Sequence, residues 1–176
     1  RFLRGDAVEV LRPSADRVPP RCAVSGPGGC GGCDWQHLST QAQRRLKAEV
    51  VQEQLGRLAG VDLDVTVEPV PGDDDGLGWR TRVRHAVAPS GRLGLRAHRS
   101  HDVVEVEACP IAHPAVQAVE RAAPSWPGAA AVEVVAPADG PALVVVEPVA
   151  GGSARVSPPG RLVLDASVAV SGPQGL

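Results

Sequence analysis

Hydrophobic residues recur at helical spacing in one long segment of the chain, residues 38–60. The apolar positions fall on one stripe made of Leu38, Ala42, Leu46, Val50, Val51, Leu55 and Leu58. Charged side chains occupy most of the remaining positions, which is typical of an amphipathic helix with one packed face. Thr40 and Gln43 form a capping-box pattern, and Gly60 stands where a stop signal is expected. We therefore predict a helix between Thr40 and Gly60.

A second, shorter helix is predicted directly after His113. Pro114 suits the first helical position, because its missing N–H would have no partner there in any case. Val116 and Val119 then fall on one side of a helix that extends to about Ala123.

Alternating apolar and polar residues predict strands in much of the remaining chain. The segments concerned are Asp6–Leu11, Asp62–Val70, Trp79–Ala88, Leu93–His98, Asp102–Val106, Val132–Val135, Leu143–Glu147, Ala154–Val156 and Leu162–Asp165. Pro89–Arg92 reads as a hairpin turn, and Gly151-Gly152 reads as the tip of a second hairpin. The expected fold class is α+β, with a largely antiparallel β-sheet, two helices and a cysteine-rich loop.

Length and composition bound the possibilities further. A chain of 176 residues suffices for one domain with a core, or for one domain and a piece of another. The chain begins with arginine and contains no methionine, so we expect it to be a fragment of a longer protein. No apolar run approaches the ~20 residues that span a bilayer. Free cysteines without a targeting segment predict a reducing, cytoplasmic location, and we expect a monomer that does not bind membranes.

The net charge of −2 argues against a nucleic-acid partner, but the distribution of charge argues for one. Residues 77–101 contain six arginines and no carboxylate. Arg80, Arg82 and Arg84 alternate along one predicted strand, so their side chains share one face. Because guanidinium groups about 7 Å apart repel one another, we predict that this face contacts RNA phosphates. A charged solvent face is the alternative. Trp79 is interpreted as a packing anchor, with stacking on a base as the alternative.

Four cysteines carry the strongest chemical signal in the chain. Cys22, Cys30 and Cys33 lie in the glycine-rich segment Arg21–His37, and Cys109 lies far downstream. Four cysteine sulfurs suffice to hold an iron–sulfur cluster, and flanking glycines let backbone N–H groups approach the sulfurs closely. The spacing therefore favours a single inorganic centre bound by all four cysteines.

Several other interpretations of the cysteines remain open. A structural zinc site uses the same four ligands and also favours two cysteines separated by two residues. Two disulfides are arithmetically possible, although no secretion signal is present, and the thiols could simply be buried. His37 or His113 could replace one cysteine as a ligand.

Motifs that would identify an active site are missing from the chain. We find no glycine-rich phosphate loop, no dinucleotide-binding fingerprint, no H-E-x-x-H and no serine nucleophile elbow. His85, His98 and His101 are assigned no catalytic role. The sequence thus predicts a metal-holding module with an arginine face and no catalytic residues of its own.

Four segments together resemble a known family. The cysteine segment, followed in order by L-G-W-R-T-R-V-R-H, G-R-L-G-L-R and V-V-E-V-E-A-C-P-I, resembles the iron–sulfur-containing RNA (uracil-5-)-methyltransferases. Members of that family have a TRAM domain, a central cluster-bearing domain and a methyltransferase domain that uses S-adenosylmethionine. The resemblance implies a [4Fe-4S] cluster on Cys22, Cys30, Cys33 and Cys109, although the loop before Cys30 is longer than is usual in the family.

The resemblance also implies a domain organisation. Residues 1–20 would be the last strand of a truncated TRAM domain, residues 21–176 the central RNA-binding domain, and the methyltransferase domain would follow downstream. The expected activity of the parent protein is 5-methyluridine formation in structured RNA, which we expect to be ribosomal. The family's catalytic thiolate, which attacks C6 of uracil, would lie outside this chain. Two alternatives remain, a non-catalytic RNA-binding module stabilised by zinc or a cluster, and an iron–sulfur redox or sensor protein.

Overall fold

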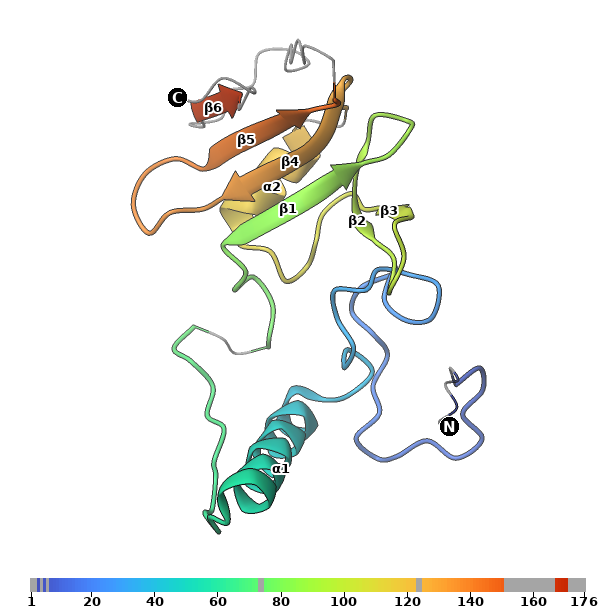
Figure 1. The fold of residues 1–176 in the computed structure, drawn as a ribbon, viewed down its shortest axis with the longest axis vertical. Helices are drawn as coiled ribbons and strands as arrows, with labels where there is room; N and C mark the ends of the chain where they lie inside the picture. Colours follow the sequence, from blue (N-terminus) through green and yellow to red (C-terminus); the bar gives the residue numbers. More distant parts are fainter. Residues whose placement is uncertain are drawn as a thin grey trace.

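The computed structural model describes residues 3, 5, 7–72, 75–122 and 125–150, together with the backbone of residues 167–170. Two helices and six strands form its regular elements (Figure 1). In chain order they are α1 (Thr40–Ala59), β1 (Arg82–Val87), β2 (Leu93–Arg96), β3 (Val103–Glu105), α2 (Pro114–Ala122), β4 (Ala129–Val135), β5 (Leu143–Pro148) and β6 (Ser167–Val170).

The strands form a single sheet in the order β3-β2-β1-β4-β5-β6. Strands β1 to β5 pair antiparallel with their neighbours, and β6 pairs parallel with β5. The predicted α+β class with a largely antiparallel sheet and two helices is confirmed. The central strands β4 and β5 match the predicted segments closely, whereas β2 ends at Arg96 and β3 starts at Val103, because the residues between them form the turn of a hairpin.

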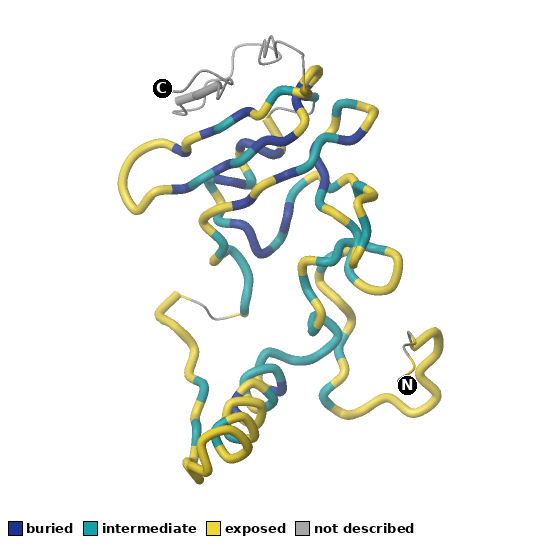
Figure 2. Tube along the Cα trace, viewed as in Figure 1, coloured by how far each residue is buried: buried dark blue, intermediate teal, exposed yellow. Residues whose placement is uncertain are grey.

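The core lies between the sheet and α2, which covers one face of the strands (Figure 1). Alternation of side chains along a strand places Val83 of β1 and Val132 of β4 on this inner face. Val116 and Val119 of α2 pack against them. Figure 2 shows that buried residues concentrate in these elements, whereas most of α1 is exposed. Each fully buried valine contributes about 1.5–3 kcal/mol to folding, so this region anchors the structure.

The predicted hairpin turn between β1 and β2 is confirmed. The N–H of Ala88 donates to the carbonyl of Arg92 at 2.9 Å, and the N–H of Gly91 donates to the carbonyl of Ala88 at 2.8 Å. Gly91 has a φ of 83°, a conformation that glycine adopts without steric strain. A side chain here would also meet the hydroxyl of Ser125 at 2.8 Å, so glycine is required twice over.

Helix α1 begins and ends where the sequence predicts, but its cap lies one residue earlier. The Ser39 hydroxyl accepts a hydrogen bond from the N–H of Ala42 at 3.2 Å, which makes Ser39 the N-cap residue in place of Thr40. The Gln43 side chain donates to the carbonyls of Trp35 and Leu38, each at 3.0 Å. Gly60 ends the helix with a φ of 64°.

The predicted packed stripe of α1 is only partly correct. Ala42 is fully buried near the start of the helix, but Val50 and Val51 are exposed and Leu58 retains 77% of its accessible surface. The C-terminal half of α1 projects away from the sheet (Figure 1), so its apolar residues have no part of the core to contact.

Two predicted strands do not form. Residues 7–11 and residues 61–70 have no regular structure. The second segment runs back beside α1 (Figure 1), where Gln52 donates to Asp64 at 3.3 Å. Alternation of residue types favours a strand only where a partner strand supplies the hydrogen bonds, and neither described segment has one.

Some predictions concern residues that lie outside the described part of the chain. These are the strands at 154–156 and 162–165 and the Gly151-Gly152 hairpin tip. Among the described residues, neither helix is both long and apolar enough to cross a lipid bilayer.

Candidate metal centre

The loop that carries the first three cysteines folds tightly on itself. The N–H of Ser25 donates to the carbonyl of Cys22 at 3.1 Å, and the N–H of Cys30 donates to the carbonyl of Val24 at 2.8 Å. A Cβ atom at Gly29 would lie 2.2 Å from the carbonyl oxygen of Val24. This close approach explains why glycine precedes Cys30.

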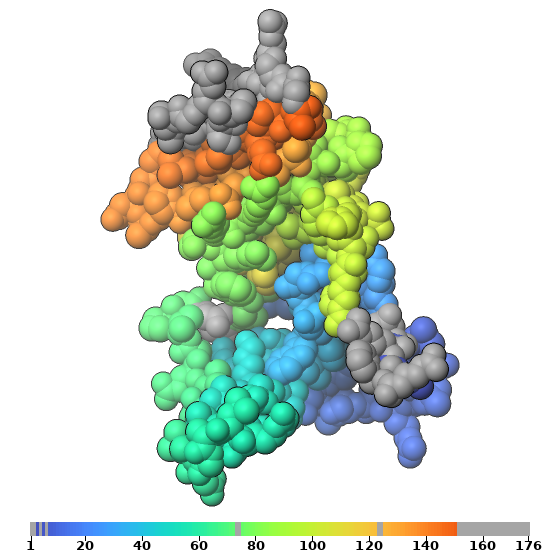
Figure 3. All heavy atoms as spheres, in the orientation of Figure 1, coloured from blue at the N-terminus to red at the C-terminus, as the bar shows by residue number. Residues whose placement is uncertain are grey.

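The same loop docks on the hairpin formed by β2 and β3. Cys30 forms an antiparallel bridge with Ala97, and the N–H of Gly31 donates to the carbonyl of Arg96 at 3.1 Å. A Cβ atom at Gly31 would lie 2.7 Å from the Cα atom of His98. Figure 3 shows the cysteine loop, in light blue, packed against the yellow-green hairpin. The cysteine loop and the hairpin are therefore held together by backbone contacts.

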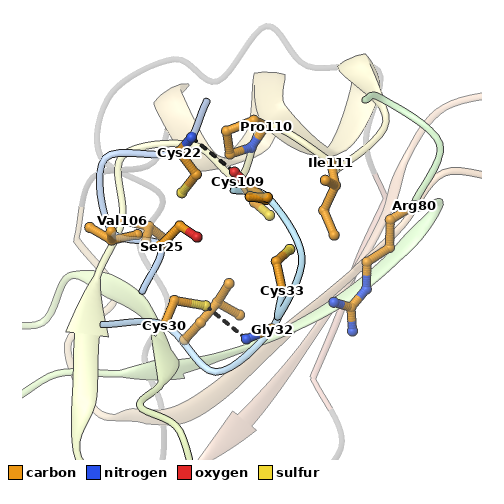
Figure 4. A pocket seen from close by; sticks show the side chains of 13 residues that line it. Cys22, Ser25, Cys30, Gly32, Cys33, Arg80, Val106, Cys109, Pro110 and Ile111 are labelled. Atoms are coloured by element: carbon orange, nitrogen blue, oxygen red, sulfur yellow. Dashed lines mark hydrogen bonds between the residues drawn. The ribbon is translucent and has the colours of Figure 1, made fainter. Parts of the chain in front are cut away.

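Cys109 belongs to a separate segment of the chain that lies next to the cysteine loop. It follows β3 and begins a turn in which the N–H of Ala112 donates to its carbonyl at 3.0 Å, just before α2. Figure 4 shows the side chains of Cys33 and Cys109 directed toward the same hollow. All four predicted cysteines, Cys22, Cys30, Cys33 and Cys109, line this hollow. The structure thus brings the two distant parts of the sequence together.

Burial raises the pKa of the Cys30 thiol, and the neighbouring thiols of Cys33 and Cys22 raise it further. The N–H of Gly32, 3.4 Å from the Cys30 sulfur, and the guanidinium of Arg80 act in the opposite direction. Burial likewise raises the pKa of Cys109. A raised pKa disfavours the thiolate, which is both the nucleophile and the metal ligand, so the thiols of Cys30 and Cys109 would have to release their protons when a metal binds.

The donor set fits a thiolate-bound centre. Its four sulfurs are the ligands that iron–sulfur clusters and structural zinc sites use, and backbone N–H groups of Ile111 and Ala112 act on the Cys109 sulfur. Within the described residues, however, no three Cys, His, Asp or Glu side chains are close enough to ligate one ion. The arrangement thus forms no ready-made site for a single ion, whereas in a four-iron cluster each of the four sulfurs would bind a different iron.

The two histidines considered as substitute ligands do not line this hollow. The Nδ1 atom of His113 accepts a hydrogen bond from the N–H of Ala115 at 3.2 Å, so His113 caps the start of α2. The backbone of His37 pairs with Val18, whose N–H donates to its carbonyl at 2.9 Å.

The arginines of the predicted RNA-binding face differ in their surroundings. Arg82 forms an ion pair of 2.8 Å with Glu133 of β4, and Arg84 forms one with Glu147 of β5. Arg82 holds the pKa of Glu133 below its ordinary value. The sequence stretch itself lacks acids, but β4, the neighbour of β1 in the sheet, and β5, the next strand beyond it, supply them. Mutual repulsion between these arginines is thereby relieved without RNA.

Arg80 lies apart from that pairing. Its Nε atom donates to the carbonyl of Arg82 at 3.2 Å, and its guanidinium lines the cysteine hollow (Figure 4). Arg99 lies at the turn between β2 and β3, has a φ of 53° and forms no ion pair among the described residues. In the described part of the chain Arg80 and Arg99 are thus not neutralised by a carboxylate, unlike Arg82 and Arg84.

Trp79 is not the packing anchor that the sequence suggested. More than half of its surface, 56%, is exposed, whereas Trp126 is 98% removed from solvent in the core, with 2% exposed. The backbone around Trp79 explains the difference, because the N–H of Arg80 pairs with the carbonyl of Ile111 at 2.8 Å before β1 begins and leaves the indole outside the sheet. The alternative of a base-stacking platform remains available.

Sequence reasoning missed one buried polar pair next to Cys109. His85 of β1 and Glu120 of α2 are both fully buried, and His85 Nε2 lies 2.6 Å from Glu120 Oε1. The other carboxylate oxygen of Glu120 accepts a hydrogen bond from the N–H of Cys109 at 3.0 Å. The sequence does contain a signal for this pair, because both polar residues stand on apolar faces. His85 shares the inward face of its strand with Val83, and Glu120 follows Val119 on the apolar side of α2.

Comparison with curated proteins reveals close relatives. The chain is 52% identical over 145 residues to a protein named as an uncharacterized RNA methyltransferase in Streptomyces coelicolor, a match covering 77% of this chain and 32% of that protein. It is 40% identical over 123 residues to the 23S rRNA (uracil(1939)-C(5))-methyltransferase RlmD of Halomonas elongata, covering 69% of this chain and 25% of the relative. A protein of the same name from Ralstonia nicotianae is 39% identical over 121 residues, covering 67% and 26%.

No protein-family profile matches the chain. The chain spans about a quarter to a third of the length of these curated relatives. The names of these relatives confirm the resemblance to RNA (uracil-5-)-methyltransferases that the motifs predict. The chain corresponds to a segment of the RNA methyltransferase family that includes the 23S rRNA uracil-C5 enzymes.

Proposed function

We propose that this chain is the metal-binding, RNA-contacting part of an S-adenosylmethionine-dependent RNA methyltransferase that forms 5-methyluridine. The observation that carries the proposal is the convergence of Cys22, Cys30, Cys33 and Cys109 on one hollow beside a basic hairpin. The names of the relatives support the reaction and a ribosomal RNA substrate. The whole protein would act in the cytoplasm, where thiols stay reduced.

The four cysteines would hold a [4Fe-4S] cluster. Such a cluster supplies a compact, redox-active cross-link among its thiolate ligands. Here the cross-link would join the loop of residues 22–33 to the turn at Cys109, which otherwise meet through the packing of Cys33 against the hydrophobic core. The chain's own part in the reaction is to keep the loop and the hairpin in a fixed relation and so to present a defined surface to the RNA.

RNA contact would come from the basic stretch of residues 77–101. Arg80, Arg82 and Arg84 would contact phosphates, with Arg82 and Arg84 exchanging their carboxylate partners for phosphate oxygens on binding. Arg99 has no such partner to lose, and Trp79 offers an exposed indole on which an unpaired base can stack. Phosphate contacts of this kind position the nucleic acid without reading its sequence.

Methyl transfer itself would be performed by residues outside this chain, and no residue described here is assigned to it. A uridine reached by such an enzyme must be single-stranded or flipped out of a stack. The contribution of this part would therefore be affinity and orientation, which act on substrate binding more than on the chemical step.

The activity is tested with the full-length protein, radiolabelled S-adenosylmethionine and protein-free 23S rRNA. We expect label in 5-methyluridine after nuclease digestion. The triple variant of Arg80, Arg82 and Arg84 to Ala should raise the RNA concentration needed for half-maximal rate. Label in any other nucleoside would contradict the proposed reaction, and an unchanged RNA dependence would contradict the proposed contact.

A non-catalytic zinc-stabilised module is the second candidate, because four cysteines of this spacing suit zinc equally well. The absorption spectrum distinguishes bound zinc from an iron–sulfur cluster. A cluster gives broad absorption near ~400 nm after anaerobic purification, whereas a zinc-bound protein is colourless there.

A further inference from the structure

His85 and Glu120 are the buried polar side chains among the described residues, and Glu120 contacts the backbone of the fourth cysteine. Both side chains are completely removed from solvent. They come from different elements, β1 and α2, and both positions belong to otherwise apolar faces that carry Val83 and Val119. Figure 1 shows α2 lying across the sheet at this place.

Glu120 joins this pair to the fourth cysteine. One carboxylate oxygen meets His85 Nε2 at 2.6 Å, and the other accepts from the N–H of Cys109 at 3.0 Å. A buried backbone N–H requires an acceptor, and at Cys109 this acceptor is a side-chain carboxylate rather than a backbone carbonyl. The position of the Cys109 backbone therefore depends on where Glu120 is held.

His85 in turn fixes the carboxylate. Its Nδ1 atom is buried and has no hydrogen-bond partner among the described residues. A proton on Nδ1 would be a buried donor without an acceptor, which is costly, so the arrangement favours the tautomer that carries its proton on Nε2 and donates to Glu120. The imidazole thus orients Glu120 toward Cys109.

Core stability alone gives little reason for such a pair. Replacing both partners of a buried hydrogen bond by apolar groups of the same shape can be nearly neutral or stabilising, whereas removing a single partner leaves the other unsatisfied and is costly. Two leucines at these positions would extend the surrounding valine core. The contact that an apolar pair could not make is the hydrogen bond to Cys109.

We propose that Glu120, oriented by His85, is a positioning residue for the metal centre, holding the Cys109 backbone so that its sulfur faces the other three. The inference rests on the proposed metal site. Partners outside the ligand shell set the orientation of ligands and tune the metal, and their loss weakens binding by about tenfold or more. A carboxylate beside one ligand also disfavours reduction of the centre, because reduction adds negative charge.

The test compares three variants of the full-length protein, purified without oxygen. Glu120→Gln keeps the size of the side chain and removes its charge. The double variant His85→Leu with Glu120→Leu removes the polar contact but preserves packing. Glu133→Gln makes the same charge change on the outer face of the sheet, where Glu133 pairs with Arg82, and serves as the control.

Three readouts are measured, namely the melting temperature of the metal-free protein, the rate at which absorption near ~400 nm is lost in air, and the midpoint potential. We expect the double variant to fold with a lower melting temperature, because the buried N–H of Cys109 loses its acceptor, and to lose its cluster about tenfold faster. Glu120→Gln should raise the midpoint potential, and Glu133→Gln should change neither property.

Equal cluster lifetimes and potentials in wild type and both core variants would overturn the inference. So would loss of the metal-free fold in both core variants, since the pair would then be a folding element. If wild type binds zinc and shows no absorption, the cluster proposal fails, but the positioning role is still tested by zinc release to a chelating dye, which should be faster in the double variant.

Discussion

Replacement of Gly31 by alanine examines whether the cysteine loop depends on its contact with the hairpin. The added Cβ atom would lie 2.7 Å from the Cα atom and 2.9 Å from the backbone nitrogen of His98. Backbone atoms cannot move aside as the end of a flexible side chain can, so the loop must shift away from the hairpin. The shift would break the 3.1 Å hydrogen bond from Gly31 to Arg96.

The expected change in the free energy of opening the loop follows from the steric clash and from the broken hydrogen bond. Overpacking costs about 1–3 kcal/mol, and a lost hydrogen bond costs about 1 kcal/mol. Local opening of the loop should thus become easier by about 2–4 kcal/mol. Since 1.4 kcal/mol corresponds to a factor of ten, amide hydrogen exchange in residues 22–33 and 93–105 should accelerate about 30-fold or more.

The assay is hydrogen exchange with mass spectrometry on the metal-free, full-length protein, which isolates the contact from any effect of metal. Gly56→Ala is the matched control, because the nearest atom to its Cβ would be the carbonyl oxygen of Val61 at 4.0 Å. Within a helix this change should stabilise by about 1 kcal/mol. Unchanged exchange in the loop and hairpin of Gly31→Ala would refute the reasoning.

Three further changes follow from other parts of the structure. Arg99→Ala should weaken RNA binding and lower the slope of log affinity against log salt concentration by about one. Arg82→Ala should have a smaller effect on RNA binding, because Glu133 already neutralises Arg82. Equal effects of the two variants in a filter-binding titration would contradict this ranking. Trp126→Ala should lower the free energy of unfolding by about 3–5 kcal/mol, because Trp126 is only 2% exposed. Chemical denaturation measures this change. A decrease below about 1 kcal/mol would show that Trp126 is not part of the core. Ser39→Ala should destabilise α1 by about 1 kcal/mol in the same assay, since the Ser39 hydroxyl caps the helix. Thr40→Ala should have little effect on stability. A larger loss of stability in Thr40→Ala than in Ser39→Ala would show that Thr40 is the cap.

Elements with local signals were predicted well from the sequence. Helix α1 ends at Gly60 because glycine adopts the left-handed conformation there, and the turn at Pro89–Arg92 depends on Gly91 in the same way. These features are decided by residues a few positions apart. The strand predicted at residues 62–70 does not form, because a strand there would need a partner strand from a distant part of the chain, which the alternation of residue types does not reveal.

Contacts between distant residues account for the errors at the site. The carboxylates that neutralise Arg82 and Arg84 lie 51 and 63 positions away in the sequence, on β4 and β5, which come close to β1 only in the folded sheet. The buried pair of His85 and Glu120 is separated by 35 positions. The structure does bring the four cysteines to one hollow, as the sequence predicts, even though Cys109 is remote from the rest; their role as metal ligands stays a prediction.

The convergence of the four cysteines on one cofactor is the central claim, and the absorption spectrum of the anaerobically purified full-length protein tests it most directly. The account predicts a broad band near ~400 nm that is present in wild type and absent when Cys109 is replaced by serine. A colourless wild-type protein, or a band that is unchanged in Cys109→Ser, would contradict it.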